Sequence, residues 1–224
     1  AEPGLLHAIA IALGLLALGT LFTDISNNFL GLFQIKLLKS DILIPDGFFP
    51  LLLFLMNYVL IIPFLEELLF RGIILHTFRR FALIISALFY AMAEETYTSF
   101  ISTFLFGIVV GYFVLHSRSI FTGILMHIFQ NIIIVILSIF TSALESDAAT
   151  IAQTTLFLIM ITVSIFAVIR FIKKEKKPFA VTENASDSDL TLSARFKTAL
   201  CNPAFILFSL VFLYRFVQLV QIFK

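Results

Sequence analysis

Long runs of apolar residues, separated by short polar stretches, dominate the chain of 224 residues. A helix needs about 20 mostly apolar residues to cross a bilayer, and about seven runs approach or exceed that length. None of these runs alternates apolar and polar residues with a period of two, so the pattern favours helices over a transmembrane barrel. We therefore predict an all-α, polytopic transmembrane helical bundle. The predicted spans cover residues 5–22, 51–78, 81–95, 99–116, 119–140, 151–172 and 203–223.

The segment 48–79 is too long for one straight span. As a helix it would extend roughly 46 Å at about 1.5 Å per residue, against a hydrocarbon core of about 30 Å. It forms either a hairpin broken at Pro63 or one tilted helix that is kinked there. Because Ile62 and Phe64 flank the proline and no turn residues stand beside it, we predict the single kinked helix.

The segment 23–47 is mixed in polarity, so we do not predict a membrane span there. Within it, residues 29–39 combine apolar residues with two lysines, which is typical of a helix lying in the membrane interface. The Asp46-Gly47 pair then predicts a turn before the next apolar run.

The composition supports a membrane protein and excludes several other classes. Hydrophobic residues make up 60% of the chain and charged residues 13%, with a mean hydropathy of +1.07, whereas a soluble domain is nearer half apolar and a quarter charged. These values exclude a soluble enzyme, a disordered chain and a collagen-like repeat. The net charge of +1 creates no field that would attract nucleic acid, so we expect no nucleic-acid partner. The single cysteine, Cys201, cannot form an intrachain disulfide.

Basic residues indicate both the orientation and the organisation of the chain. They gather on one side of the predicted bundle, so we predict a multi-pass integral membrane protein whose basic loops are cytoplasmic. We predict a membrane-embedded body at 1–172, a cytoplasmic polar linker at 173–202 and a C-terminal transmembrane helix at 203–224. Because the chain starts with neither Met nor a basic n-region, we expect no signal peptide and a natural start further upstream. The basic residues on this side are Arg79, Arg80, Arg118, Arg170, Lys173, Lys174, Lys176, Lys177, Arg195 and Lys197.

Ionisable side chains inside the predicted spans are the main candidates for chemistry, because each costs a few kcal/mol or more in hydrocarbon. Glu67 and Arg71 are four residues apart on one helix face, so we expect them to form an ion pair. Glu66 lies about 100° further round that helix and has no obvious helical partner. It therefore either holds a proton or faces a hydrated cavity, and it becomes the candidate general base or acid. The full set is Glu66, Glu67, Arg71, Glu94, His127 and Arg215, with Asn131 as a polar companion.

His127 and Asn131 are also four residues apart, on one face of a later helix. Such a pair could donate two hydrogen bonds to a carbonyl oxygen as that oxygen gains charge. Counting about 1.5 Å per residue from the basic end of each helix places Glu66, Glu94 and Asn131 roughly 20 Å deep and His127 roughly 14 Å deep. We therefore expect three separate helices to bring polar groups to one level, around one hydrated pocket.

The sequence around these residues resembles a known family. Residues 63–72 read Pro-Phe-Leu-Glu-Glu-Leu-Leu-Phe-Arg-Gly and are similar to the first motif, EExxxR, of the CPBP family. This family comprises CAAX-type prenyl proteases and bacteriocin-processing or self-immunity membrane proteins. His127 and Asn131 match its HxxxN motif, and the resemblance covers roughly residues 55–135.

The resemblance implies a CPBP-like core and a glutamate-type intramembrane endopeptidase. In that family pattern Glu66 would activate a water together with the histidine of a second motif. The Glu67 and Arg71 pair would be structural, and His127 with Asn131 would stabilise the oxyanion. The substrate would be a membrane-associated peptide or a lipidated protein tail, and the lipid bilayer would be the surrounding partner.

The second motif of the family, FxxxH, is altered in this chain. Tyr90 stands at the Phe position, Glu94 stands at the His position, and no histidine lies between Phe81 and Leu115. A carboxylate at Glu94 beside Glu66 could share one proton around a water, as aspartic dyads do. The same substitution could instead mark a catalytically impaired protein that serves as scaffold or regulator of a membrane protein partner. We predict the peptidase and keep the non-catalytic protein as the alternative.

A metal site is the less favoured interpretation of the same groups. Glu66, Glu94 and His127 could form a carboxylate-rich zinc site. The chain has no HExxH motif, however, and its other histidines lie at the ends of spans. We therefore expect no metal and no cofactor.

The last predicted helix carries a polar stripe of Arg215, Gln218 and Gln221. Polar side chains within lipid should face protein or water. We expect this stripe to dock either on the body of the chain or on a separate membrane protein partner.

Overall fold

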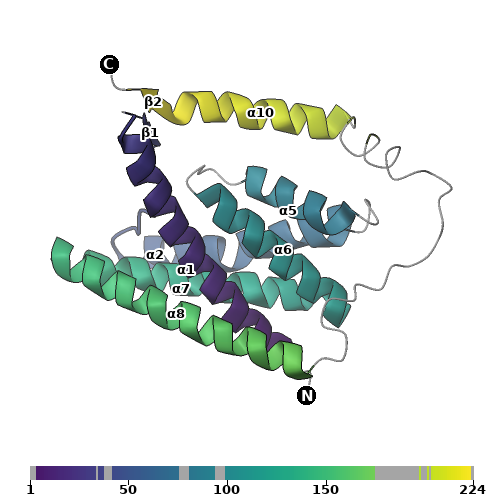
Figure 1. Cartoon of the computed structure of the whole chain (residues 1–224), viewed down its shortest axis with the longest axis horizontal. Helices are drawn as coiled ribbons and strands as arrows, with labels where there is room; N and C mark the ends of the chain where they lie inside the picture. The colour runs from purple at the N-terminus through teal and green to yellow at the C-terminus, as the bar shows by residue number, and fades with distance from the viewer. Residues whose placement is uncertain are drawn as a thin grey trace.

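The computed structural model describes residues 4–33, 35–37, 42–75, 81–93, 99–174, 197, 201 and 203–222. Helices dominate this part of the chain, with one short pair of strands (Figure 1). In chain order the elements are α1 Gly4–Gly31, β1 Ile35–Leu37, α2 Phe48–Leu55, the π-helix η1 Met56–Ile61, α3 Ile62–Glu67, the π-helix η2 Leu68–Ile74, α5 Ala82–Ala93, α6 Phe100–Ser117, α7 Ile120–Ser142, α8 Ser146–Lys174, α10 Pro203–Leu219 and β2 Val220–Ile222.

Five of these helices are long and apolar enough to cross a membrane, which confirms the polytopic helical prediction. They are α1, the continuous helix Phe48–Ile74, α6, α7 and α8. The apolar helix α5 has only 12 residues, so at about 1.5 Å per residue it is shorter than a bilayer core. Large apolar side chains of α8, such as Ile159 and Phe166, are more than half exposed, as surfaces that face lipid should be. The chain is therefore an integral membrane protein.

The segment around Pro63 forms one continuous helix, Phe48–Ile74, as predicted, and not a hairpin. Its hydrogen bonding changes along its length, because the π-helices η1 and η2 flank the short α3 that contains Pro63. Proline has no backbone N–H, so the turn before it cannot keep its full set of hydrogen bonds. A π-helical stretch is a known adjustment at such points and is frequent at functional sites. As a result, Glu66 and Glu67 lie between two irregular turns of one helix.

Two expectations about helix boundaries were wrong. The first helix continues to Gly31 and Ile35–Leu37 form a strand, so the described part of residues 29–39 is not a separate interfacial helix. The last helix ends at Leu219 and not at 223. Beyond these ends, Ile35–Leu37 and Val220–Ile222 form an antiparallel pair with Lys36 opposite Gln221. The pairing joins segments far apart in the sequence and satisfies backbone groups beyond the helix ends, which a local apolar pattern does not encode.

Helix α1 crosses the bundle and packs closely against α6 and α8 (Figure 1). Two glycines allow this approach, since a methyl group on Gly14 would lie 2.0 Å from Cβ of Ser164 and one on Gly19 would lie 1.9 Å from Cβ of Ser102. Small residues at helix crossings of this kind let membrane helices pack by van der Waals contact. Ser102 also lines the cavity described below, so α1 supports the wall of that cavity.

The variant Gly19→Ala is expected to lower the free energy of unfolding by about 1–3 kcal/mol, the usual cost of overpacking a close contact. Alanine is otherwise the better helix former, so the steric clash must outweigh a gain of about 1 kcal/mol. Reversible unfolding in mixed micelles measures the difference. Gly4→Ala is the control, because a methyl group there meets nothing within 4 Å. Equal stability of the two variants would contradict the close packing of α1.

One end of the bundle gathers three helix termini. Phe171 of α8 has ring contacts with His7 near the start of α1 and with Tyr112 and His116 near the end of α6. Lys173 and Lys174 end α8 at this point, and Arg118 follows α6. Arg118, Lys173 and Lys174 thus gather at one end of the bundle, while the cytoplasmic orientation of that end stays a prediction.

Candidate active site

A fully buried ion pair forms the base of the site. Arg71 Nη1 donates to Glu67 Oε1 at 2.7 Å, and both side chains have no exposed surface. The guanidinium also lies 3.5 Å from the carbonyl oxygen of Gly107 through Nη2 and 4.5 Å from the ring centre of Tyr90. The i,i+4 spacing therefore forms the expected pair, and further helices enclose it.

Glu67 is held in a space that only a glycine can provide. A methyl group on Gly123 of α7 would lie 2.6 Å from Glu67 Oε2 and 2.8 Å from Cγ2 of Val114. Among the described residues, Oε2 has no hydrogen-bond partner. Oε1 accepts a hydrogen bond from Arg71 and also contacts His127. The close approach of α7 at Gly123 thus brings the next turn of α7 against the glutamates.

His127 lies between the two glutamates. Its Nδ1 is 3.2 Å from Glu67 Oε1, and its Nε2 is 3.6 Å from Glu66 Oε2. Because Glu67 is paired with Arg71, its carboxylate only accepts, so Nδ1 of His127 carries the hydrogen. The other ring nitrogen, Nε2, lies on the side of Glu66 and of the Tyr90 hydroxyl, whose oxygen is 3.2 Å away.

Asn131 is fixed by the irregular helix on the other side of the site. Within η1 the N–H of Ile62 bonds to the carbonyl of Asn57, five residues earlier. The next N–H in this π pattern would belong to Pro63, which has none, so the carbonyl of Tyr58 is left for another donor. Asn131 Nδ2 donates to that carbonyl at 2.8 Å. The proline of the first motif thereby sets the position of the asparagine of the last motif.

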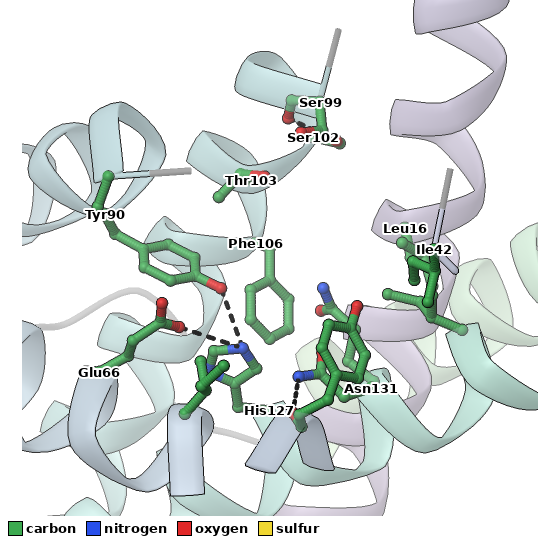
Figure 2. A pocket seen from close by; sticks show the side chains of 15 residues that line it. Leu16, Ile42, Glu66, Tyr90, Ser99, Ser102, Thr103, Phe106, His127 and Asn131 are labelled. Atoms are coloured by element: carbon green, nitrogen blue, oxygen red, sulfur yellow. Dashed lines mark hydrogen bonds and ion pairs between the residues drawn. The ribbon is translucent and has the colours of Figure 1, made fainter. Parts of the chain in front are cut away.

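These groups meet at a cavity of about 480 Å³ (Figure 2). The side chain of Glu66 is 30% exposed toward this space, whereas that of Glu67 is fully enclosed. Figure 2 shows Glu66 and Tyr90 approaching the same nitrogen of His127 from two different helices. The polar residues on the cavity wall are Tyr58, Glu66, Tyr90, Ser99, Ser102, Thr103, His127, Gln130 and Asn131.

The structure brings together most of the residues that the sequence singled out. Glu66, His127 and Asn131 line the cavity, and the Glu67 and Arg71 pair lies directly behind them. Glu94 lies outside the described residues. The side chains of the Arg215, Gln218 and Gln221 stripe also lie outside them, so its docking stays a prediction.

Sequence reasoning missed two residues that complete the site. Tyr90 contributes its hydroxyl and Tyr58 its carbonyl oxygen. A signal for Tyr90 was present, because a tyrosine stood at the Phe position of the second motif, one helical turn before Glu94. No signal indicated Tyr58, whose carbonyl matters only because of the local π geometry.

The zinc site considered from the sequence includes Glu94, which lies outside the described residues, so the absence of a metal stays a prediction. Within the described residues, no three His, Cys, Asp or Glu side chains are grouped so that they could hold a metal ion. The described groups around the cavity include a carboxylate, an imidazole, an amide and a phenol.

Comparison with known proteins found a family model that matches the central part of the chain. Residues 48–133 match the family model described as type II CAAX prenyl endopeptidase Rce1-like. Neither the curated proteins nor the solved structures yielded a match. The matched segment begins with α2 and ends within α7, so it contains both motifs and every polar group from Glu66 to Asn131. The central region of this membrane protein is thus similar to the CAAX prenyl endopeptidases, which is consistent with the resemblance to the CPBP family.

Proposed function

We propose that the chain is an intramembrane endopeptidase that hydrolyses peptide bonds of membrane-associated or lipidated peptides with a water activated by Glu66. The observation that carries this proposal is the placement of Glu66. Its carboxylate is partly exposed to the cavity and lies 3.6 Å from His127 Nε2. A carboxylate in such a place can bind a water and accept its proton, which is the role of a general base.

The hydrolytic step follows from the groups around the cavity. The water oxygen forms a bond to the carbonyl carbon, its proton passes to Glu66 Oε2, and the carbonyl electron pair moves onto oxygen. The bond from carbon to nitrogen then breaks, and the leaving nitrogen takes the proton from Glu66. Asn131 uses one of its two N–H hydrogens for the carbonyl of Tyr58, and the second is available to the oxyanion.

Two features favour a substrate that arrives from the bilayer. The cavity wall combines polar groups with the apolar side chains of Leu16, Ile62 and Ile134, so it suits a peptide with apolar side chains. The helix that carries Glu66 also exposes large apolar side chains such as Leu65 and Leu69 to the surroundings. A lipid-anchored peptide would reach such a site without leaving the membrane.

A hydrolysis assay in liposomes tests the proposal. The purified chain is incubated in oxygen-18 water with matched membrane peptides that carry or lack a prenyl group, and products are read by mass spectrometry. We expect cleavage in which one labelled oxygen enters the new carboxyl group, with no loss on addition of a metal chelator. A mock preparation from cells that do not express the chain, purified identically, controls for a contaminating peptidase. Absence of cleavage across the panel would refute the peptidase.

The non-catalytic protein remains a second candidate because of one observation, the glutamate at position 94 where the family motif has histidine. If the wild-type chain cleaves nothing and Glu94→His creates cleavage, the chain is an impaired member that serves as scaffold or regulator. Cleavage by the wild-type chain decides for the peptidase.

A further inference from the structure

The phenol of Tyr90 is the one side-chain hydroxyl with a described hydrogen bond to His127. Its oxygen lies 3.2 Å from His127 Nε2 and belongs to the cavity wall, although the residue as a whole is only 2% exposed. Figure 2 shows this hydroxyl pointing at the same nitrogen that Glu66 approaches. Any carbonyl placed for attack by a water on Glu66 would therefore lie close to the phenol.

The hydroxyl is a hydrogen-bond donor beside the place where an oxyanion would form. Asn131 gives one of its two N–H hydrogens to the carbonyl of Tyr58, so it can give a single hydrogen bond to an oxyanion. His127 is held from behind by the contact of its Nδ1 with Glu67, which is paired with Arg71. Its Nε2 faces both Glu66 and the phenol. A phenol can donate to this nitrogen or to a nearby oxygen, so the hydroxyl can serve as a second oxyanion donor.

We propose that Tyr90 is a catalytic residue whose hydroxyl donates a hydrogen bond to the oxyanion of the tetrahedral intermediate. This inference rests on the proposed peptidase function. The hydroxyl hydrogen rotates about the C–O bond, so it can turn toward the substrate oxygen when substrate is bound. The proton stays on the phenol throughout, while the water proton passes to Glu66 and then to the leaving nitrogen.

The ring of Tyr90 is held firmly enough for this task. The guanidinium of Arg71 lies over one face at 4.5 Å, and the ring of Phe70 contacts it edge-on with centroids 5.3 Å apart. The ring of Phe106 lies 6.2 Å away and also contacts His127. An oxyanion donor is effective when it is already oriented before the reaction. Packing on several sides supplies that orientation, and it should also hold a phenylalanine in the same place.

The test is the variant Tyr90→Phe, which removes one hydroxyl and keeps the ring. We expect kcat to fall by about 10²–10³-fold, the usual loss for one oxyanion donor, with little change in KM. Affinity for a peptidyl trifluoromethyl ketone, whose hydrate mimics the tetrahedral intermediate, should fall together with kcat, while affinity for an uncleaved peptide should not. Tyr112→Phe is the control, since that tyrosine lies at the far end of α6 and outside the cavity.

Three outcomes overturn the assignment, and they differ in what else they refute. If the wild type cleaves and Tyr90→Phe keeps its rate within about threefold, far below the loss expected for an oxyanion donor, Tyr90 is not catalytic and the peptidase stands. If kcat falls but affinity for the ketone does not, and nitrogen-15 spectra show a changed His127 tautomer, Tyr90 only positions the imidazole. If the wild type cleaves nothing, the proposed function fails, and the role of Tyr90 fails with it.

Discussion

Replacing Glu66 by glutamine is expected to abolish most of the cleavage while the chain keeps its fold. The amide has the same shape as the carboxylate but cannot accept a proton from water, so kcat should fall by about 10²–10⁴-fold, the usual contribution of a general base. Little stability should be lost, because the side chain is 30% exposed and its described partner, His127 Nε2, is as far as 3.6 Å away. Initial rates in liposomes and an unfolding curve in mixed micelles give both quantities.

The matched control is Glu145→Gln, since Glu145 is an exposed acid in the turn between α7 and α8. This variant makes the same chemical change far from the cavity and should keep the wild-type rate. A Glu66→Gln chain that cleaves nearly as well as Glu145→Gln would show that another group activates the water. Among the described residues that line the cavity, His127 would then be the next candidate for the base.

The composition and helical spacing of the sequence were enough to predict the class of fold and most of the site. The pair of Glu67 and Arg71 follows from i,i+4 geometry, and it forms as expected. Counting helix rise from the basic ends placed Glu66 and Asn131 roughly 20 Å deep and His127 roughly 14 Å deep, around one pocket. Glu66, His127 and Asn131 do line one cavity, and Glu66 Oε2 lies 3.6 Å from His127 Nε2. These predictions succeed because a bilayer fixes the depth of each spanning helix, so few other arrangements of residues at the same depth are left.

The remaining features depend on contacts that no single segment specifies. The carbonyl of Tyr58 becomes an acceptor only because a π-helix meets Pro63, and Asn131 reaches it from another helix. The hydroxyl of Tyr90 reaches His127 only because α5 and α7 both pack against α6. Likewise, the strand Ile35–Leu37 exists through its pairing with the end of the chain. Local patterns predict elements, whereas these features arise from the way elements are combined.

The largest effect on stability is expected from Arg71→Met, which should lower the free energy of unfolding by about 3–5 kcal/mol. Methionine fills similar space but leaves the carboxylate of Glu67 buried without its counter-ion, and that side chain has no exposed surface. The contact of the guanidinium with the Tyr90 ring is lost as well. Reversible unfolding in mixed micelles, with detergent ratio as the variable, measures the change.

The double variant Glu67→Gln/Arg71→Met separates an unpaired charge from lost packing. If the charge dominates, removing the carboxylate as well should recover at least half of the lost stability, because a neutral amide costs far less to bury. Nearly equal losses in the single and double variants would instead assign the effect to packing around Tyr90. A loss of less than about 1 kcal/mol in Arg71→Met would contradict the buried pair altogether, since that is the range of exposed pairs. Because Glu67 also accepts from His127, the double variant should remain inactive even where its stability recovers.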